Sequence, residues 1–291
     1  MRVLLTGASG FVGRHAAAAL LARGMEVHTL GRTPVPGTIH HPTDLLDPAA
    51  TTRATTAARA THLLHLAWFV EPGAYWTSPR NLDWVAASLA LARAFADSGG
   101  TRLLGVGTCA EYQWGAPRLV EDQTPCRPAT LYGASKDALH RLLRAAGPAL
   151  GLSVAWARLF YLYGPGEGPN RLVSGAVATL RAGGTFATSH GRQRRDFLHV
   201  ADAAAALAAL LLHELQGPVN IGSGQAVPVR TILEHVAATL HHQGRIDFGA
   251  RPLSPAEPDV IEADTTRLHG QLGFTPRFDL GAGLQDTLAA T

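Results

Sequence analysis

Near its amino end the chain reads Arg2-Val3-Leu4-Leu5-Thr6-Gly7-Ala8-Ser9-Gly10-Phe11-Val12-Gly13, and an apolar helical pattern continues to Leu21. The order is a β-rich run, a glycine loop and a helix. Glycines let backbone N–H groups approach a pyrophosphate, and the N-terminus of a helix favours an anion. The spacing Gly-x-x-Gly-x-x-Gly is one residue longer at its first gap than the usual dinucleotide fingerprint. This context favours a dinucleotide site, and a simple tight turn between strand and helix is the alternative.

The composition describes an ordinary globular protein. Of its 291 residues, 46% are hydrophobic and 16% are charged, the opposite of the balance in disordered proteins. The formal net charge of +3 is mild and the arginines are scattered, so we expect no nucleic-acid partner. We also expect no metal, because the adjacent pairs His40-His41 and His241-His242 diverge and lack acidic or cysteine partners at ligand spacing.

The cysteines and the apolar stretches bear on the compartment. Cys109 and Cys126 form no disulfide framework, which is typical of a reducing cytoplasm. We expect no signal peptide, because strand-like residues come first. The longest apolar stretch, at residues 203–212, is far shorter than the ~20 residues of a membrane span. We therefore expect a cytoplasmic protein with no membrane partner.

Strands and helices are expected to alternate along much of the chain. We expect strands at residues 26–30, 61–67 and 102–107, and long helices at residues 81–96 and 131–146. Alternation implies crossover connections, and hence an α/β fold with a doubly wound parallel sheet, the Rossmann architecture. After Gly164 this rhythm loosens and prolines accumulate. We expect a dinucleotide-binding domain in residues 1–160 and a smaller C-terminal substrate lobe, mainly residues 161–291, with some segments returning to the sheet.

The end of the second expected strand bears on the choice of cofactor. An acid there binds the adenosine ribose of NAD, whereas an arginine accommodates the 2′-phosphate of NADP. The sequence has Arg32 and no acid, which favours NADP(H). NAD(H) and a plain surface arginine are the alternatives. Asp44 stands where a carboxylate would accept from the adenine amino group, or would cap a helix.

Tyr132 and Lys136 predict the chemistry. Lys136 is the only lysine among 25 lysines and arginines, and it follows Tyr132 by four residues, so that the two share a helix face. An ammonium beside a phenol lowers a pKa that starts near 10, which makes Tyr132 a candidate general acid or base. Chance placement is the alternative. Thr108 ends a strand at the carboxyl edge of the sheet, where open α/β folds bind ligands, and is expected to face the same pocket.

Together these features resemble the extended short-chain dehydrogenase/reductases, and among them the nucleotide-sugar epimerases, dehydratases and ketoreductases. The resemblance covers essentially the whole chain. Three further segments carry it: Leu159-Phe160-Tyr161-Leu162-Tyr163-Gly164-Pro165-Gly166, Arg195-Asp196-Phe197-Leu198-His199-Val200 and Asn220-Ile221-Gly222-Ser223-Gly224.

The resemblance implies roles for individual residues. Thr108 and Tyr132 would contact the reacting sugar oxygen, Lys136 would bind the nicotinamide ribose, and Arg195 would grip the substrate diphosphate. The implied cofactor contacts are Gly7, Ser9, Gly10, Phe11, Val12, Gly13, Arg32, Asp44, Leu45, Leu66, Ala67, Asn81, Tyr132 and Lys136. The implied substrate contacts are Thr108, Cys109, Trp114, Tyr161, Arg171, Arg195 and Arg251.

Some of these substrate residues have plainer interpretations. The family commonly has an asparagine that helps to hold the diphosphate where this chain has Tyr161. Trp114 either closes over the sugar or packs in its loop. Arg171 and Arg251 either bind phosphate or are surface charges.

The residues and the resemblance together predict NADPH-dependent reduction of a nucleotide-linked 4-keto-6-deoxy-hexose, with Tyr132 donating the proton. Related dehydratases place Asp-Glu directly after the catalytic threonine, where this chain has Cys109 and Ala110, so we expect no 4,6-dehydration. Glu111 lies one place later and is expected to face the other side of the backbone. A 4-epimerase that retains its cofactor and a non-catalytic dinucleotide sensor are the alternatives. The helices expected at residues 81–96 and 131–146 match those that pair in family dimers, so we expect a homodimer that binds a nucleotide-diphosphate sugar.

Overall fold

The computed structural model describes residues 1–241, 244–254 and 257–290, and its centre is a parallel sheet of seven strands. The strand order is β10-β6-β5-β4-β1-β2-β3, so the chain reverses direction across the sheet between β1 and β4. The strands are β1 (Arg2–Thr6), β2 (Glu26–Gly31), β3 (Ile39–Pro42), β4 (His62–His65), β5 (Arg102–Thr108), β6 (Ser153–Leu159) and β10 (Gly217–Ile221). This is the doubly wound sheet that the sequence predicts.

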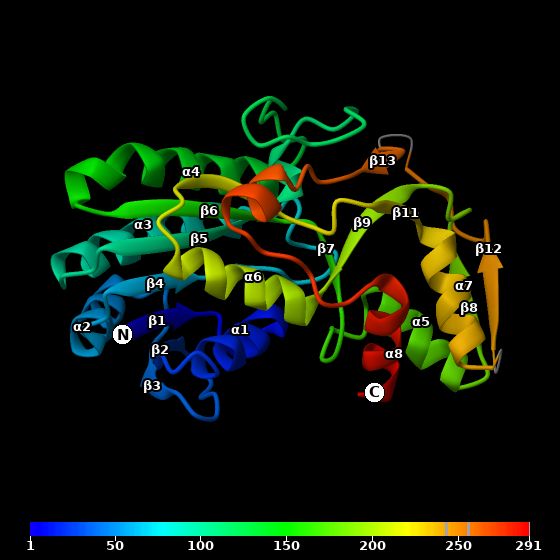
Figure 1. Cartoon of the computed structure of the whole chain (residues 1–291), viewed down its shortest axis with the longest axis horizontal. Coiled ribbons are helices and arrows are strands. Elements are labelled where there is room, and N and C mark those ends of the chain that lie inside the picture. Colours follow the sequence, from blue (N-terminus) through cyan, green and yellow to red (C-terminus); the bar gives the residue numbers. More distant parts are fainter. Residues whose placement is uncertain (242–243, 255–256, 291) are drawn as a thin grey trace.

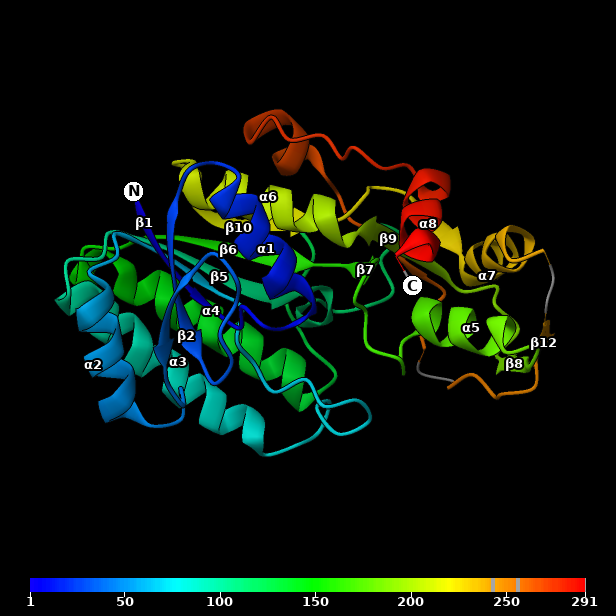
Figure 2. The ribbon, with the colours of Figure 1, turned by 90° about the horizontal axis from the view of Figure 1, so that it is seen from below.

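Helices cover both faces of the sheet (Figures 1 and 2). One face carries α1 (Phe11–Leu21) and α6 (Val200–Leu212), whose buried alanines and leucines form one core with the strands. The other face carries α2 (Pro48–Ala58), α3 (Arg80–Asp97) and α4 (Leu131–Leu150), which form a second core. Apolar side chains point to both faces of each central strand because both faces are covered.

The C-terminal part forms a smaller layer around two short sheets (Figure 1). Strand β9 is central in one sheet, where β11, β13 and β7 pair with it, and β8 pairs with β12 in the other. The strands are β7 (Tyr161–Tyr163), β8 (Thr185–Thr188), β9 (Arg194–His199), β11 (Ala226–Pro228), β12 (Arg245–Phe248) and β13 (Val260–Ile261). The helices are α5 (Leu172–Arg181), α7 (Val229–Thr239) and α8 (Leu280–Ala289). These helices bury a third core against the strands.

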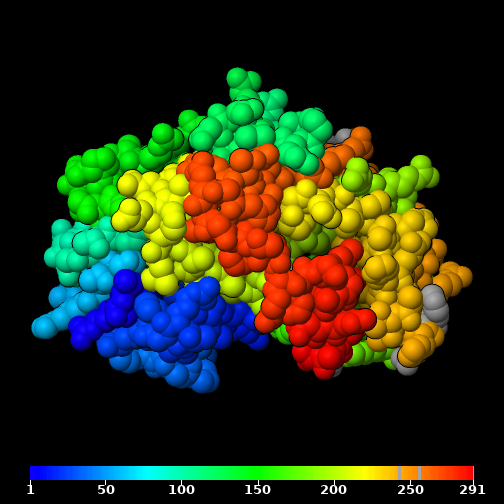
Figure 3. All heavy atoms as spheres, in the orientation of Figure 1, coloured from blue at the N-terminus to red at the C-terminus, as the bar shows by residue number. Residues whose placement is uncertain are grey.

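The last part of the chain returns to the seven-stranded sheet and covers α6. The π-helical turn η2 (Arg267–Gln271) buries Leu268 in the core around α6, and the Phe278 N–H donates to Asp202 of α6 at 2.9 Å. Figure 3 shows this segment in orange and red beside the yellow residues of α6. The C-terminal part and the seven-stranded sheet are therefore held together by packing as well as by the chain.

The expected elements are present, with ends that differ by a few residues. Helix α4 extends four residues beyond the predicted residue 146, through Pro148, and ends at Gly151 in the left-handed conformation with φ +66°. Glycine adopts this conformation at little cost, so it sets the end of the helix. Among the described residues, no helix is both long and apolar enough to cross a membrane.

Candidate functional site

The glycine loop after β1 requires glycine at two positions. Gly7 has φ +72°, and a Cβ atom there would lie 2.8 Å from the backbone N of Ala67, which follows β4. A Cβ on Gly13 would overlap the carbonyl oxygen of Gly7. Close approach of backbone to backbone therefore leaves the N-terminus of α1 open at the carboxyl ends of β1 and β4. This cradle fits a dinucleotide diphosphate.

Thr108 and Tyr132 are brought together by close packing between β5 and α4. Thr108 ends β5 and accepts from the Ala110 N–H at 3.2 Å, which starts the short 3-10 helix η1 (Cys109–Glu111). A Cβ on Gly133 would overlap the carbonyl oxygen of Ala110, so the first turn of α4 lies directly against η1. The Thr108 hydroxyl therefore lies close enough to Tyr132 to lower the pKa of its phenol, as the sequence predicts that the two residues share a site.

The electrostatics of Tyr132 and Lys136 differ from the expectation. Burial raises the pKa of Tyr132, and hydrogen bonding with Thr108 opposes this rise only in part. Nζ of Lys136 donates to the Val106 carbonyl at 2.8 Å and lies 3.8 Å from the ring centre of Trp68. Burial lowers the pKa of Lys136 to about 7. The predicted lowering of the Tyr132 pKa by Lys136 is therefore wrong for this structure, because burial raises that pKa and Lys136 is not among the groups that lower it.

The loop of residues 68–79 covers the candidate catalytic tyrosine. The backbone N–H of Tyr132 donates to the Trp76 carbonyl at 3.1 Å, and the rings of Tyr75 and Trp76 meet the Tyr132 ring nearly at right angles. Asn81 is fully buried and anchors the loop: its side chain accepts from Trp68 Nε1 at 2.8 Å and donates to the Tyr75 carbonyl at 2.7 Å. The sequence shows four aromatic residues in this loop, but no local pattern predicts a role for them.

Cys109, Tyr161 and Arg195, three of the predicted substrate residues, lie close to one another next to Thr108. The Arg195 guanidinium is 2% exposed, lies 5.7 Å from the Tyr161 ring centre and forms an ion pair with Glu257. The positive charge of Arg195 acts to lower the pKa of both the Cys109 thiol and the Tyr161 phenol, so the three side chains form one group. Burial raises the pKa of the Cys109 thiol to about 12. Trp114 donates from Nε1 to the Cys109 carbonyl at 3.4 Å and packs at the edge of the same group.

Other predicted residues lie further out. Arg32 is exposed directly after β2, and Asp44 is exposed with its carboxylate capping the Leu46 N–H at 3.0 Å. Asp44 thus caps a turn, and Asp47 is the residue that caps α2. Arg251 is exposed beyond β12, where its N–H donates to the Thr188 carbonyl. The remaining predicted cofactor residues line the two cores or the loop near Gly7: Ser9, Gly10, Phe11, Val12, Leu45, Leu66 and Ala67.

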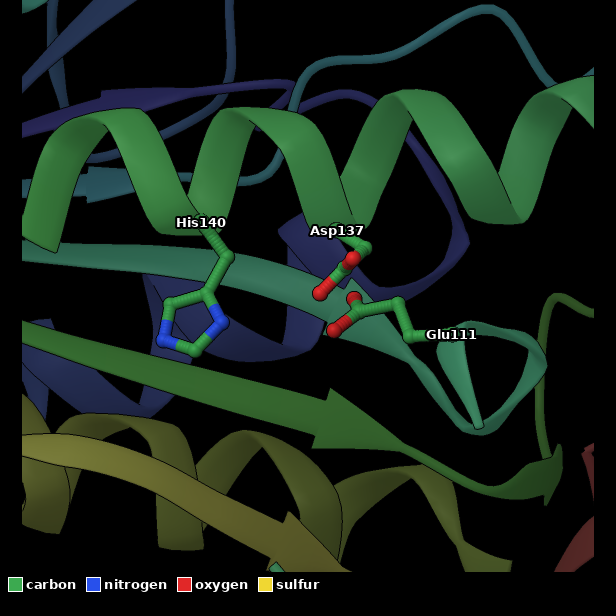
Figure 4. Close-up of side chains that lie close together, drawn as sticks. All are labelled: Glu111, Asp137 and His140. Carbon is green, nitrogen blue, oxygen red and sulfur yellow. The ribbon is translucent and has the colours of Figure 1, made fainter. Parts of the chain in front are cut away.

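A buried cluster of ionisable side chains from η1 and α4 lies close to Thr108. Figure 4 shows its three members. Glu111, Asp137 and His140 place ligand-type atoms within 4.8 Å of one another. Glu111 is fully buried and accepts from the Thr108 N–H at 2.9 Å and from Arg158 Nε at 2.7 Å. The guanidinium thus supplies the positive charge that a buried carboxylate requires.

The cluster explains where Glu111 points. The Glu111 side chain lies on the other side of the backbone, as expected. The turn of η1 places it there, whereas the expectation rested on strand alternation. No local pattern in the sequence predicts its pairing with Arg158, because the two residues are 47 positions apart. The histidine pairs of the sequence are elsewhere: His41 hydrogen-bonds His28 at 2.8 Å, and His242 lies outside the described residues.

Two surface hollows lie far from this group. They have volumes of about 450 and 430 Å³ and are lined by residues such as Arg102, Ser153 and Gly217, which begin strands of the main sheet. The amino ends of the strands are opposite the edge that carries Thr108. Arg102 donates to the carbonyl of Leu210, in the last turn of α6, at 2.8 Å and to that of Leu215, after α6, at 2.7 Å, so its guanidinium already has hydrogen-bond partners. The functional site is therefore placed at the carboxyl edge.

The fold and the glycine loop define a Rossmann-type dinucleotide-binding protein. Residues 3–222 match the NAD dependent epimerase/dehydratase family, and the chain belongs to that family. It is 28% identical over 317 residues to a UDP-glucose 4-epimerase of Azospirillum brasilense, covering 96% of this chain and 88% of the relative. It is 24% identical over 246 residues to a dTDP-6-deoxy-L-talose 4-dehydrogenase (NAD(+)) of Aggregatibacter actinomycetemcomitans, covering 82% and 90%.

A solved structure agrees with this assignment. The Thermus thermophilus UDP-glucose 4-epimerase in complex with NAD superimposes with a TM-score of 0.87 at 27% identity, covering 100% of this chain and 98% of that one. The fold prediction and the family resemblance are thus confirmed. The chain is an enzyme of the nucleotide-sugar epimerase/dehydratase type that uses an NAD(P) dinucleotide.

Proposed function

We propose that the chain uses NADPH to reduce the keto group of a nucleotide-linked 4-keto-6-deoxy-hexose, with Tyr132 donating a proton to the keto oxygen. The observation that carries this proposal is the proximity of the Thr108 hydroxyl to the Tyr132 phenol, beside Cys109 and Ala110. A bound dinucleotide supplies the hydride. The chain supplies the proton and the hydrogen bonds that stabilise negative charge on the oxygen.

The protonation state of Tyr132 supports reduction. Because burial raises its pKa, the phenol holds its proton at neutral pH, and this is the form that a reduction consumes. Thr108 supplies a second hydroxyl at the same place. Lys136 would orient the nicotinamide ribose, a role that the family resemblance implies.

The residues after Thr108 support a substrate that already lacks its C6 hydroxyl. Loss of that hydroxyl requires a second acid and a second base. Cys109 has a pKa of about 12 and is therefore a weak acid, and Ala110 carries no proton. Glu111 is held by Arg158 and Trp156 on the other side of η1. We therefore propose that hydride transfer at C4 is the remaining chemistry.

Two arginines support the proposed ligand contacts: the exposed Arg32 bears on the cofactor, and the buried Arg195 bears on the substrate diphosphate. Arg32 is exposed directly after β2, which supports NADP(H), whereas the name of the Thermus thermophilus complex supports NAD(H) as the alternative. Arg195 stands beside Tyr161 with a pairing to Glu257 that an incoming diphosphate would replace. We propose that residues 1–160 bind the dinucleotide and that residues after 160 mainly bind the substrate.

The relatives favour two reactions at the same carbon. The name of the Aggregatibacter relative describes oxidation or reduction at C4 of a nucleotide-linked 6-deoxyhexose, which supports the ketoreductase. The names of the Azospirillum and Thermus relatives support a 4-epimerase as the second candidate. An epimerase would use the same Tyr132 to remove a proton and then return it, with the cofactor retained.

Cofactor release separates the two candidates. The purified chain is incubated with NADPH and a dTDP-linked 4-keto-6-deoxy-hexose, and separately with UDP-glucose and either NAD⁺ or NADP⁺. A ketoreductase releases one oxidised cofactor for each reduced sugar, which NADPH absorbance and mass spectrometry record together. Conversion of UDP-glucose to its C4 epimer, with no net change in cofactor, would favour the epimerase instead.

The surface of α3 and α4 supports a homodimer. These adjacent helices expose Leu82 and Leu142, at 58% and 48%, on the outer side of the layer. Large apolar side chains of this kind are typical of a face that packs against a second copy. We therefore propose that the chain forms a dimer through α3 and α4.

A further inference from the structure

Tyr75 lies against the candidate catalytic tyrosine but belongs to a different segment. Its side chain is 8% exposed, and its ring centre lies 5.0 Å from that of Tyr132 with an interplanar angle of 88°. The Trp76 ring meets Tyr132 in the same way at 5.7 Å. We call Tyr75 and Trp76 the aromatic wall. It fixes the tilt of the Tyr132 ring on one side.

The backbone of this wall is held before any substrate arrives. Asn81 donates to the carbonyls of Tyr75 and Ser78 at 2.7 and 2.9 Å, and accepts from Trp68 Nε1. The Tyr132 N–H donates to the Trp76 carbonyl at 3.1 Å. A wall that is already ordered loses little conformational entropy when a ligand binds.

The hydroxyl of Tyr75 faces the C-terminal part of the molecule. Arg171, the exposed N-cap residue of α5, lies with its guanidinium 5.8 Å from the Tyr75 ring centre, close enough to oppose the rise that burial causes in the pKa of the Tyr75 phenol. Cys109 is also near enough for its charge to affect Tyr75. The Tyr75 hydroxyl therefore lies between Arg171 and the strand end that carries Thr108.

The Tyr75 hydroxyl keeps a hydrogen to donate. Arginine has only donors, so Arg171 offers no acceptor for it. Within residues 1–241, 244–254 and 257–290, no acceptor for this hydrogen is found. A hydroxyl with an unused donor, on a tyrosine that is only 8% exposed and lies beside the reacting groups, is suited to an oxygen atom of a ligand.

We propose that Tyr75 is a specificity-determining residue whose hydroxyl donates a hydrogen bond to a hydroxyl or ring oxygen of the hexose, with Arg171 holding the phenol in place. The proposal rests on the function proposed above, because it assumes that Tyr132 marks the position of the sugar. The ring of Tyr75 would also contact the C–H groups of the hexose. Tyr75 would thus contribute to the affinity for the sugar and would not contribute to the affinity for the nucleoside diphosphate.

The test compares binding of a sugar nucleotide with binding of the bare nucleotide. Isothermal titration calorimetry measures the affinities of the full chain for UDP-glucose, dTDP-glucose, UDP and dTDP. Tyr75→Phe keeps the aromatic wall and removes only the hydroxyl. We expect it to weaken binding of the better hexose ligand about threefold to tenfold and to leave the matching bare nucleotide unchanged. Tyr163→Phe, which removes a phenol buried in the core around α5 and α7, is the matched control and should change neither affinity.

The other possible outcomes contradict the role of Tyr75, the proposed substrate class or the ketoreductase proposal. Equal losses for hexose and bare nucleotide, or no loss for either, overturn the role of Tyr75. If the wild-type chain binds none of the four ligands, both this inference and the proposed substrate class are wrong. If the Tyr75→Phe difference is present but no keto sugar is reduced with NADPH, the ketoreductase proposal fails and the role of Tyr75 stands.

Discussion

Replacement of Lys136 by methionine should change how the stability of the chain depends on pH. Lys136 is 3% exposed, and its ammonium donates to the Val106 carbonyl and lies over the Trp68 ring. Burial lowers its pKa from 10.5 to about 7, and the charge of Glu111 opposes this effect. Methionine has a similar length and no charge. Lys136→Met therefore removes one buried titrating group and keeps most of the packing.

The sign and size of the effect follow from the two pKa values. Between pH 7 and pH 10.5 the unfolded chain holds a proton on Lys136 that the folded chain has released. The free energy of unfolding of the wild type therefore rises with pH in this window, by about 1.4 kcal/mol per pH unit. From pH 7 to pH 9 the gain is about 2.3 kcal/mol relative to Lys136→Met, because Lys136 of the folded chain is still half protonated at pH 7. Below pH 6 both states are protonated, so the difference between the two proteins is constant.

Urea unfolding followed by tryptophan fluorescence, in cofactor-free protein at several pH values, measures this difference. All other titrating groups are common to both proteins, and their contributions cancel. Arg144→Met, which removes an exposed cation from the same helix, is the control and should give a line parallel to the wild type. If the wild type and Lys136→Met also gave parallel lines from pH 7 to pH 9, the reasoning about a desolvated ammonium would be refuted.

Four further outcomes follow from the same structure. Arg32→Asp should weaken NADPH binding tenfold or more while sparing NADH, because a charge-assisted contact is worth about 1.5 to 3 kcal/mol; equal wild-type affinities for the two cofactors would contradict this. Tyr132→Phe should keep cofactor binding and lower turnover about 10²- to 10⁴-fold in the keto-sugar assay, and near-normal turnover would remove Tyr132 as the proton donor. Incubation with dTDP-glucose and NAD(P)⁺ should give no loss of water by mass spectrometry, since Cys109 and Ala110 replace an acid and a base; a 4-keto-6-deoxy product would overturn the ketoreductase. Light scattering at micromolar concentration should give the mass of a dimer, and a monomer would exclude pairing through α3 and α4.

The fold follows largely from local sequence signals. The first strand, the glycine loop and the helix after it are adjacent in sequence, so spacing alone predicts them. The end of α4 is less accessible to such reasoning. Pro148 normally stops a helix, but it lies close to Gly151, where the helix ends in any case. The sequence predicts the return of β10 to the main sheet only in outline, because strand order depends on contacts between distant segments.

The composition of the candidate site was predictable, and its electrostatics were not. The spacing of Tyr132 and Lys136 and the place of Thr108 at a strand end require only helix and sheet geometry. The pKa of Tyr132 depends on how much solvent the loop of residues 68–79 removes. That loop is positioned by Asn81, whose three hydrogen bonds no local pattern predicts.

The loop of residues 68–79 affects the pKa values of both Lys136 and Tyr132. The same segment places Trp68 over the Lys136 ammonium and Tyr75 against the Tyr132 ring. Exclusion of water there favours the neutral form of both side chains, so it lowers the pKa of the lysine and raises that of the tyrosine. A neutral phenol is a proton donor that is ready for reduction, whereas proton removal by the same phenol would first require its ionisation. The anchored loop thus keeps Tyr132 in its protonated form, which is the form that the proposed reduction consumes.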